Sequence, residues 1–316
     1  MSEIVSPTYL AKKILKRRAK RDKTKESKIF SINFKYFWLV LLCSSCRPHT
    51  PSLPDLSAFH AAPAARAEEL TMRLREQSAR VSSLRLKIDA MVHKGISSQE
   101  VTQVVSFQKP DKLRLEFFAT NLNRLTAIVI ANGTELRGVD LVHKEAYLGR
   151  NTSENIEALL SVPFSTFDLM CWLTGVFVPD EDGMSEWYLN QEENSFLLEH
   201  TGQNGQQTRM LFRSESTEAK EMLVAESLEV RRGKDQVLFY SKFSYADFKD
   251  GYVPLRPSAI EFWLPRRELS GKLRIFESAV NEPFVSDRVW ILKIPEGMDT
   301  INLDEERDGM AVNPML

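Results

Sequence analysis

The chain has 316 residues, with 43 acidic and 42 basic side chains and a formal net charge of −1. Hydrophobic residues make up 43% of it, which is enough for a sizeable core and excludes a chain that is disordered throughout. The charge is uneven, because residues 1–36 carry eleven Lys or Arg against three acids. A basic end on an acidic body indicates a targeting segment and argues against a nucleic-acid-binding fold.

Residues 1–45 show the parts of an export signal in the usual order. A long basic region is followed by the short apolar run 37–42, and small residues come next. The apolar run is much shorter than the roughly 20 residues that a membrane-spanning helix requires. We therefore predict a signal peptide with a long basic region over residues 1–45.

Ser44-Ser45-Cys46 resembles a lipobox, the site at which a bacterial lipoprotein is acylated on cysteine and cleaved before it. One departure is Cys43, which stands where an aliphatic residue is usual. The resemblance implies lipidation of Cys46 and a lipid-anchored protein that faces the periplasm. Two alternatives remain open, a basic tail on a cytosolic protein and an uncleaved anchor.

Residues 46–65 contain four prolines, which remove backbone donors and favour extended chain. They predict a tether between the acylated cysteine and a folded domain over residues 66–303. The acidic residues 304–316 are predicted to form a flexible tail.

The folded part begins with a predicted helix over residues 64–80 and continues mainly as strands. Asn132-Gly133 and Asn204-Gly205 are strong signals for tight hairpin turns. Two short helices, 152–160 and 165–173, interrupt the strands. The predicted strands cover residues 84–92, 101–107, 113–118, 125–130, 136–141, 187–189, 196–199, 209–212, 222–230, 237–245, 259–264, 271–276 and 288–293. This order predicts a mainly β (α+β) antiparallel sheet or barrel.

No catalytic motif is visible, and we expect no catalytic residue, no metal, no cofactor and no enzyme activity. The histidines, at positions 49, 60, 93, 143 and 200, are scattered and are expected at the surface or on edge strands. Residues 180–183 lack the ligand spacing of a calcium loop and are expected to be solvated. Cys171 lies in an apolar helix pattern and is expected to be a small buried hydrophobe.

Several segments together resemble the LolA/LolB family of lipoprotein carriers, and LolB most closely. The segments are 84–92, 113–118 with 120–122, 154–160 with 162–164, 172–175, 257–264, 280–281 and 294–297. The resemblance spans residues 66–303 and implies a curved, incompletely closed antiparallel β-barrel with plug helices around an apolar cavity. The loop corresponding to the membrane-inserting loop of LolB lacks its Pro and Gly, and Leu122 and Leu125 would be its membrane-facing residues.

The family resemblance also implies partners and a function. A LolB-like monomer is anchored at the outer membrane, receives acylated lipoproteins from a periplasmic LolA-type carrier and inserts them in the membrane. Nucleic acid is not an expected partner. An alternative is an envelope sensor or scaffold that binds a protein.

The apolar sides of the strands supply the predicted cavity lining. These residues are Leu86, Ile88, Phe107, Leu115, Phe117, Ile128 and Ile130. Whether Phe117 or Phe118 points inward stays open, because a one-residue register change reverses a strand. Trp172 is expected to be buried in the plug near Phe167 and Leu169. The alternative is that these side chains fill a solid core and leave no hollow.

Overall fold

The computed structural model describes residues 51–120, 123–180, 182–190, 192–202, 205–216, 221–233, 236–246 and 256–305. The predicted signal peptide, Cys46, Leu122 and most of the acidic tail lie outside these ranges. Among the described residues, no helix has the length and apolarity needed to cross a membrane.

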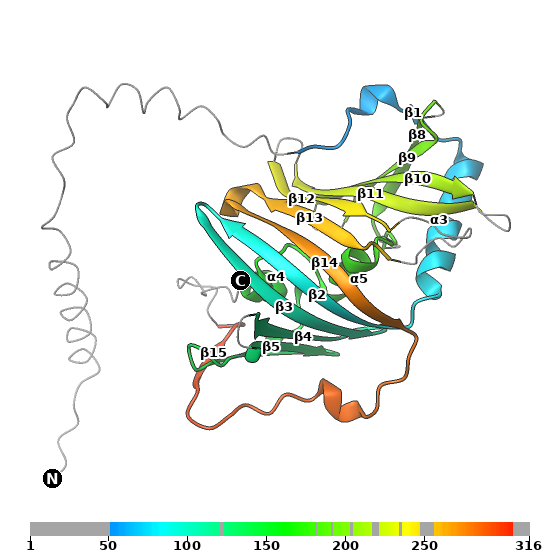
Figure 1. Cartoon of the computed structure of the whole chain (residues 1–316). Coiled ribbons are helices and arrows are strands. Elements are labelled where there is room, and N and C mark those ends of the chain that lie inside the picture. The colour runs from blue at the N-terminus through cyan, green and yellow to red at the C-terminus, as the bar shows by residue number, and fades with distance from the viewer. Residues whose placement is uncertain are drawn as a thin grey trace, which may run out of the picture. The chain divides into compact units, whose positions relative to one another are not determined.

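The described strands form one curved sheet that does not close on itself (Figure 1). In chain order they are β1 (His60–Ala61), β2 (Ser83–Lys94), β3 (Ser97–Gln108), β4 (Lys112–Ala119), β5 (Arg124–Asn132), β6 (Glu135–Asp140), β7 (Glu145–Arg150), β8 (Met184–Asn190), β9 (Ser195–Thr201), β10 (Gln206–Ser216), β11 (Glu221–Arg232), β12 (Gln236–Ser244), β13 (Ala259–Leu264), β14 (Leu269–Val280) and β15 (Asp299–Asn302). The strand order is β1-β8-β9-β10-β11-β12-β13-β14-β2-β3-β4-β5-β6-β7-β15. The mainly β, incompletely closed antiparallel fold predicted from the sequence is therefore confirmed.

Two meanders build this sheet, and one long-range pairing joins them. Within β2–β7 and within β8–β14, strands that follow one another in the chain pair antiparallel, and β14 then pairs antiparallel with β2. Ile88 lies opposite Ile275 in that pairing. Among the described strands, only β15 runs parallel to its neighbour, β7.

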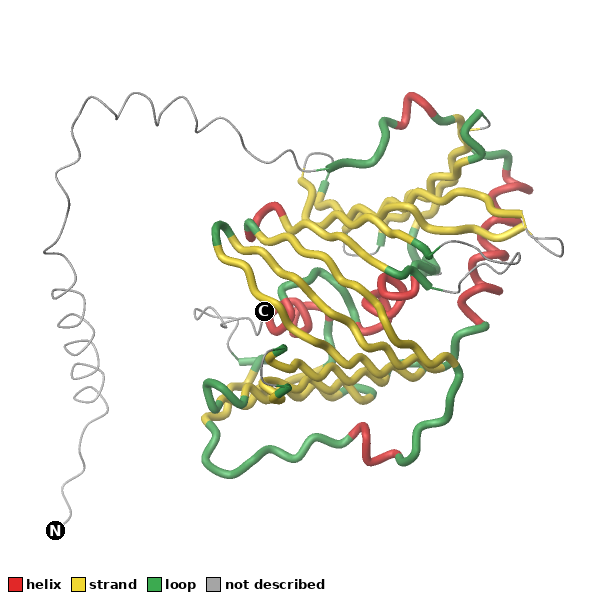
Figure 2. Tube along the Cα trace, in the orientation of Figure 1, coloured by secondary structure: helices red, strands yellow, loops and turns green. Residues whose placement is uncertain are grey.

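In the described part of the chain, three α-helices accompany the sheet: α3 (Ala64–Ala79), α4 (Ser153–Leu160) and α5 (Thr166–Thr174). Helices α4 and α5 lie within the curve of the sheet, between its upper and lower strands (Figure 2). Helix α3 is fastened to the second meander, because Gln77 exchanges hydrogen bonds with the backbone of Leu223 and Thr71 accepts one from Trp187. The concave face and the helices together enclose the main core.

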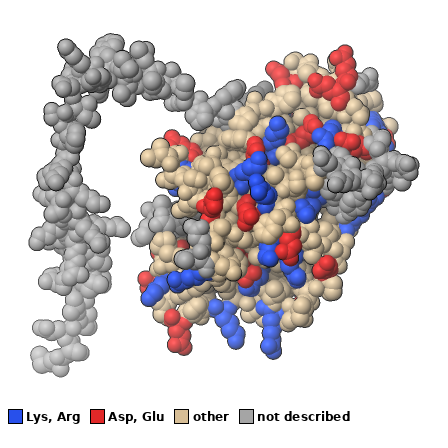
Figure 3. All heavy atoms as spheres, in the orientation of Figure 1, with Lys and Arg blue, Asp and Glu red and all other residues tan. Residues whose placement is uncertain are grey.

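Opposite faces of the strands have different chemistry because side chains alternate. Along β2, Leu84, Leu86 and Ile88 face the main core, and Lys87 faces outward to pair with Glu277 of β14 at 2.9 Å. On the face seen in Figure 3, acidic and basic side chains are interspersed. Cross-strand ion pairs of this exposed kind contribute little stability, at most about 1 kcal/mol each.

Two extended segments cover parts of the convex face. Leu53 and Phe59, which precede α3, are buried against Leu197 and Tyr240. Part of the predicted tether over residues 46–65 therefore packs against the sheet, beginning no later than Leu53. Apolar burial of its side chains outweighs the tendency of a proline-rich segment to stay solvated.

At the other end of the chain, Leu292 covers Ile130, Val139 and Ala146. The strand predicted over residues 288–293 is wrong. A 3-10 helix, η4 (Asp287–Trp290), occupies its first half, and the chain then crosses the sheet without pairing with it. One-sided burial produces an alternating pattern in any extended segment, whether or not it joins a ladder. The short strands β1, β7 and β15 were not predicted.

Two shorter 3-10 helices lie on connections, η2 (Leu56–Ala58) before β1 and η3 (Pro265–Arg267) between β13 and β14. Asp304, predicted to belong to the loose tail, accepts hydrogen bonds from Arg150 N–H and the Asn155 side chain. The ordered chain therefore extends past β15.

Candidate functional site

Helices α4 and α5 are short, and their ends are fixed by local hydrogen bonds. The Thr152 hydroxyl accepts from Asn155 N–H at the start of α4. At the start of α5, the Ser165 hydroxyl accepts from Asp168 N–H, and the Asp168 carboxylate accepts from Ser165 N–H in return. This reciprocal capping box satisfies backbone donors that a helix start leaves unpaired. The predicted helices 152–160 and 165–173 are thus present.

Helix α5 stops at Gly175, where the chain turns in the left-handed region at a φ of +68°. A side chain here would also collide, since a Cβ would lie 2.6 Å from the Tyr245 hydroxyl. Glycine avoids both the strain and the collision. The apolar helix is thereby turned back toward the second meander.

Trp172 is the centre of an aromatic cluster that holds α5 in place. Its ring lies 5.7 Å from Phe164, 5.4 Å from Phe239 and 5.9 Å from Phe262, between ring centroids. It is 5% exposed, and its indole N–H has no hydrogen-bond partner among the described residues. Burial of Trp172 was expected from the sequence, although its ring neighbours are other aromatic residues than Phe167.

An apolar cavity lies between these helices and the concave face of the sheet. Its volume is about 60 Å³. It is lined by Val92, Gln103, Val105, Leu115, Phe117, Leu160, Val162, Leu169, Trp172, Leu173, Phe262, Leu269 and Leu273. We refer to this space as the apolar cavity. Ligand pockets for small molecules commonly reach about 300 Å³ or more, so the cavity is largely filled by protein side chains.

The predicted cavity residues fall into three groups. Leu115 and Phe117 line the apolar cavity. Leu86, Ile88 and Phe107 face the same side but are buried at 0–1% exposure among other core side chains. These three contact other protein side chains, and none of them lines the apolar cavity.

Ile128 and Ile130 were assigned to the wrong face. In the β4–β5 pairing Leu115 lies opposite Val129, and Glu116 lies opposite Ile128. Both isoleucines therefore point to the convex side, where Ile130 is buried under Leu292. A continuous apolar run gives no alternation from which to choose a face. The same register places Phe117 inward, because Phe117 is 5% exposed and belongs to the main core.

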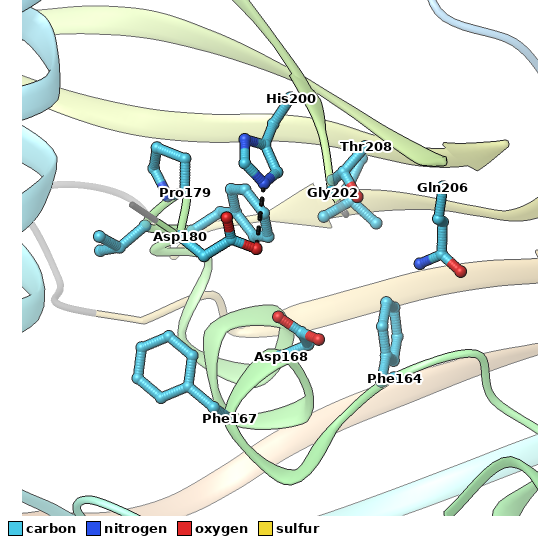
Figure 4. A pocket seen from close by; sticks show the side chains of 12 residues that line it. Phe164, Phe167, Asp168, Pro179, Asp180, His200, Gly202, Gln206 and Thr208 are labelled. Carbon is cyan, nitrogen blue, oxygen red and sulfur yellow. Dashed lines mark ion pairs between the residues drawn. The ribbon is translucent and has the colours of Figure 1, made fainter. Parts of the chain in front are cut away.

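A second hollow, about 330 Å³ in volume, lies beside the start of α5 and has both aromatic and polar walls (Figure 4). It is lined by Phe164, Phe167, Asp168, Phe177, Val178, Pro179, Asp180, His200, Gly202, Gln206, Thr208 and Leu228. We call it the mixed pocket. Phe167, predicted as a plug residue, faces this pocket, whereas Leu169 faces the apolar cavity.

His200 was expected at the surface or on an edge strand, but it lies on the inner strand β9 and is 4% exposed on the wall of the mixed pocket. Its Nδ1 lies 2.9 Å from the Ser185 hydroxyl, and its Nε2 lies 3.4 Å from an Asp180 carboxylate oxygen. Ser185 is not among the lining residues, so a molecule in the pocket would meet the imidazole and Asp180. Sequence reasoning missed this group because the antiparallel pairing of β8 with β9 places Ser185 opposite His200.

The predicted membrane-facing loop is described only in part. Leu125 is half-buried at the start of β5, and Leu122 lies outside the described residues. At the neighbouring β2–β3 turn, Ile96 is fully exposed. Cys171, in contrast, is fully buried, and burial raises the pKa of its thiol to about 12. A neutral thiol of this kind is a poor nucleophile. No cluster of three candidate metal-ligating side chains occurs in the described part of the chain.

The comparisons with known proteins give a likeness in fold. No family model matches the sequence, and no curated protein matches it. Among solved structures, a DUF1329 family protein from Desulfovibrio piger is similar with a TM-score of 0.52 at 14% identity, over 72% of this chain and 97% of that one. The likeness is one of fold alone.

Two further solved structures are similar to a lesser degree. A LolA superfamily protein from Nitrosomonas europaea has a TM-score of 0.49 at 11% identity, over 72% of this chain and 97% of that one. An outer membrane lipoprotein-sorting protein domain from Vibrio parahaemolyticus has a TM-score of 0.48 at 13% identity, over 71% of this chain and 97% of that one.

Proposed function

We propose that this protein binds the acyl chains of lipoproteins or other lipids between the concave face of its sheet and helices α4 and α5. The observation that carries the proposal is the apolar cavity, in which Gln103 is the one lining residue with a polar side chain apart from the Trp172 indole. Burying an acyl chain against such walls is favourable by about 25 cal/mol per Å² of apolar surface. No catalytic group is needed for it.

The more specific role that we propose rests on the resemblance to LolB. The protein would receive acylated lipoproteins from a periplasmic LolA-type carrier and insert them in the outer membrane. The lipid on Cys46 would hold it there, facing the periplasm. Leu122 and Leu125 would touch the membrane, together with Ile96, which is fully exposed at the adjacent turn.

Lipid entry requires the helices to move, because about 60 Å³ is too little space for an acyl chain. The turns that follow the two helices would be the hinges of such a movement. Helix α4 ends at Ser161 and α5 ends at Gly175, both in the left-handed region. A displacement of the two helices would join the cavity to the space that they now fill.

A charge placed in the apolar cavity tests the proposal. Gln103→Glu is nearly isosteric and puts a carboxylate on the cavity wall, so we expect saturable binding of a fluorescent fatty acid to the full chain to weaken at least about tenfold. Gln99→Glu is the matched control, since Gln99 lies on the same strand and face but is exposed. Circular dichroism melting would show that both variants fold.

A second candidate function is that of an envelope sensor or scaffold that binds a protein partner. The small volume of the apolar cavity favours it, because a filled core gives rigidity and no room for lipid. Folded wild-type protein without saturable fatty-acid uptake would reject the carrier function and support this one.

A further inference from the structure

The mixed pocket differs in chemistry from the apolar cavity, although α5 contributes to both. Phe167 and Asp168 face the mixed pocket, whereas Leu169 and Trp172 face the cavity. The contact between the rings of Phe164 and Trp172, 5.7 Å apart, lies between the two spaces. Two different chemical groups can therefore be bound on the two sides of this aromatic pair.

The charged groups on the walls of the mixed pocket favour a cation. Asp168 and Asp180 contribute carboxylates, and no Lys or Arg is among the described residues that line it. Phe164, Phe167 and Phe177 supply three aromatic rings. Carboxylates together with aromatic faces attract an organic cation by direct charge and by the ring quadrupole.

Two acceptors on the walls have unused hydrogen-bonding capacity. Thr208 is 8% exposed and lines the pocket, yet no described residue hydrogen-bonds to its hydroxyl. The Asp168 hydrogen bonds from Ser165 both go to one carboxylate oxygen, Oδ2. In Figure 4, Asp168 and Thr208 project into the same space from opposite sides. Both acceptors are therefore open to a ligand in the pocket that donates hydrogen bonds.

We propose that the mixed pocket binds a primary ammonium group carried on an apolar stem. The ammonium donates hydrogen bonds to Asp168 Oδ1 and to the Thr208 hydroxyl, Asp180 provides further negative charge, and the stem lies against the phenylalanine rings. This site goes beyond the proposed function, since it does not require an acyl chain in the apolar cavity. The source of the ammonium is either a free alkylamine or the head group of an aminophospholipid.

Calorimetric titration of the full chain with n-hexylammonium tests the site. Saturable binding at least about tenfold tighter than that of n-hexanol, with no binding of hexanoate, is expected from the charge of the walls. Equal affinity for the amine and the alcohol would overturn the proposal. Asp180→Asn should weaken amine binding several-fold, and the control Asp182→Asn, an exposed acid two residues along that does not line the pocket, should not.

Thr208→Val separates a ligand-binding hydroxyl from a structural one. Because this hydroxyl has no partner among the described residues, we expect the melting temperature to stay the same or rise, while affinity for n-hexylammonium falls several-fold. Affinity for n-hexyltrimethylammonium, which has no N–H, should not change. A lower melting temperature with unchanged amine affinity would contradict the role of Thr208 and the proposal with it.

Two further experiments identify the source of the ammonium group and distinguish the mixed pocket from the apolar cavity. Lysophosphatidylethanolamine that displaces n-hexylammonium, with lysophosphatidylglycerol inactive, would assign the ammonium to a lipid head group. Displacement by neither would assign it to a free amine. Gln103→Glu should leave amine binding unchanged, so that failure of fatty-acid uptake and failure of amine binding are separate results.

Discussion

Asp140 shows how one side chain can fix a turn and tune a neighbour. Its Oδ1 accepts from the backbone N–H of Val142 and His143, and its Oδ2 lies 2.7 Å from Nδ1 of His143. Burial works to raise the pKa of Asp140, but the hydrogen bonds from His143 and Val142 outweigh it and the net pKa is lowered. The hydrogen bond to Asp140 raises the pKa of His143.

We expect the His143 pKa, measured by NMR titration, to lie above its ordinary value and to return to it in Asp140→Asn. Because the folded-state pKa of His143 is raised, its contribution to stability is complete below the unfolded pKa and is lost as pH rises through the folded one. Because the folded-state pKa of Asp140 is lowered, its contribution to stability has the opposite pH dependence and is lost as pH falls through that pKa. The asparagine oxygen still accepts the turn hydrogen bonds, so an unchanged His143 pKa in this variant would contradict the assignment.

Buried charge also occurs beneath the segment that precedes α3. Glu229 is fully buried and accepts from Arg209 at 3.3 Å and from Arg231. Arg209 also donates to the carbonyl of Pro54, which joins this segment to the sheet. The carboxylate is balanced by two guanidinium groups, as a buried charge requires.

At the level of elements, the plug depends on packing, because helices of eight and nine residues are too short to be stable alone. We expect Trp172→Ala to lower the free energy of unfolding by roughly 3–5 kcal/mol, since a large buried aromatic side chain is removed. Urea denaturation would measure it. A loss below about 1 kcal/mol would show that the helix is peripheral to the core.

Arg267, on the β13–β14 connection, fastens the end of α4 to the sheet. It donates to the Ser161 hydroxyl at 2.8 Å and pairs with Glu157 at 3.3 Å. The side chains of Arg267 and Glu157 are both partly exposed, so this ion pair should contribute at most about 1 kcal/mol to global stability.

We expect Arg267→Ala to speed hydrogen exchange of the α4 amides and to speed fatty-acid uptake, with little change in melting temperature. Arg266→Ala, one residue away and exposed, is the matched control. Unchanged exchange in α4 would show that the contact does not restrain the helix.

At the scale of the whole molecule, the proposed anchor and the folded domain can be separated by one substitution. We expect Cys46→Ser to convert a membrane-bound, detergent-extracted protein into a soluble or unprocessed one, because a covalently attached lipid is the proposed anchor. Fractionation followed by mass measurement would show it. Mature-sized Cys46→Ser protein that remains with membranes would contradict lipidation.

The sequence by itself determined the type and the order of most elements. Alternation along residues such as Leu84, Leu86 and Ile88 reports one-sided burial, and the capping residues Thr152 and Ser165 mark helix starts, because both signals are local. It also placed Trp172 in the core, since a short apolar helix has to be held by packing.

Tertiary structure alone decided which face each strand presents and which distant groups meet. Ile128 and Ile130 lie in a continuous apolar run, and only the pairing of Leu115 with Val129 turns them outward. Asp168, Asp180 and Thr208 come from a helix, a loop and a strand, and they surround one pocket only because the sheet curves around α5. Such contacts depend on long-range strand pairing and on the curvature of the sheet, and the local spacing of residues in the sequence reports neither.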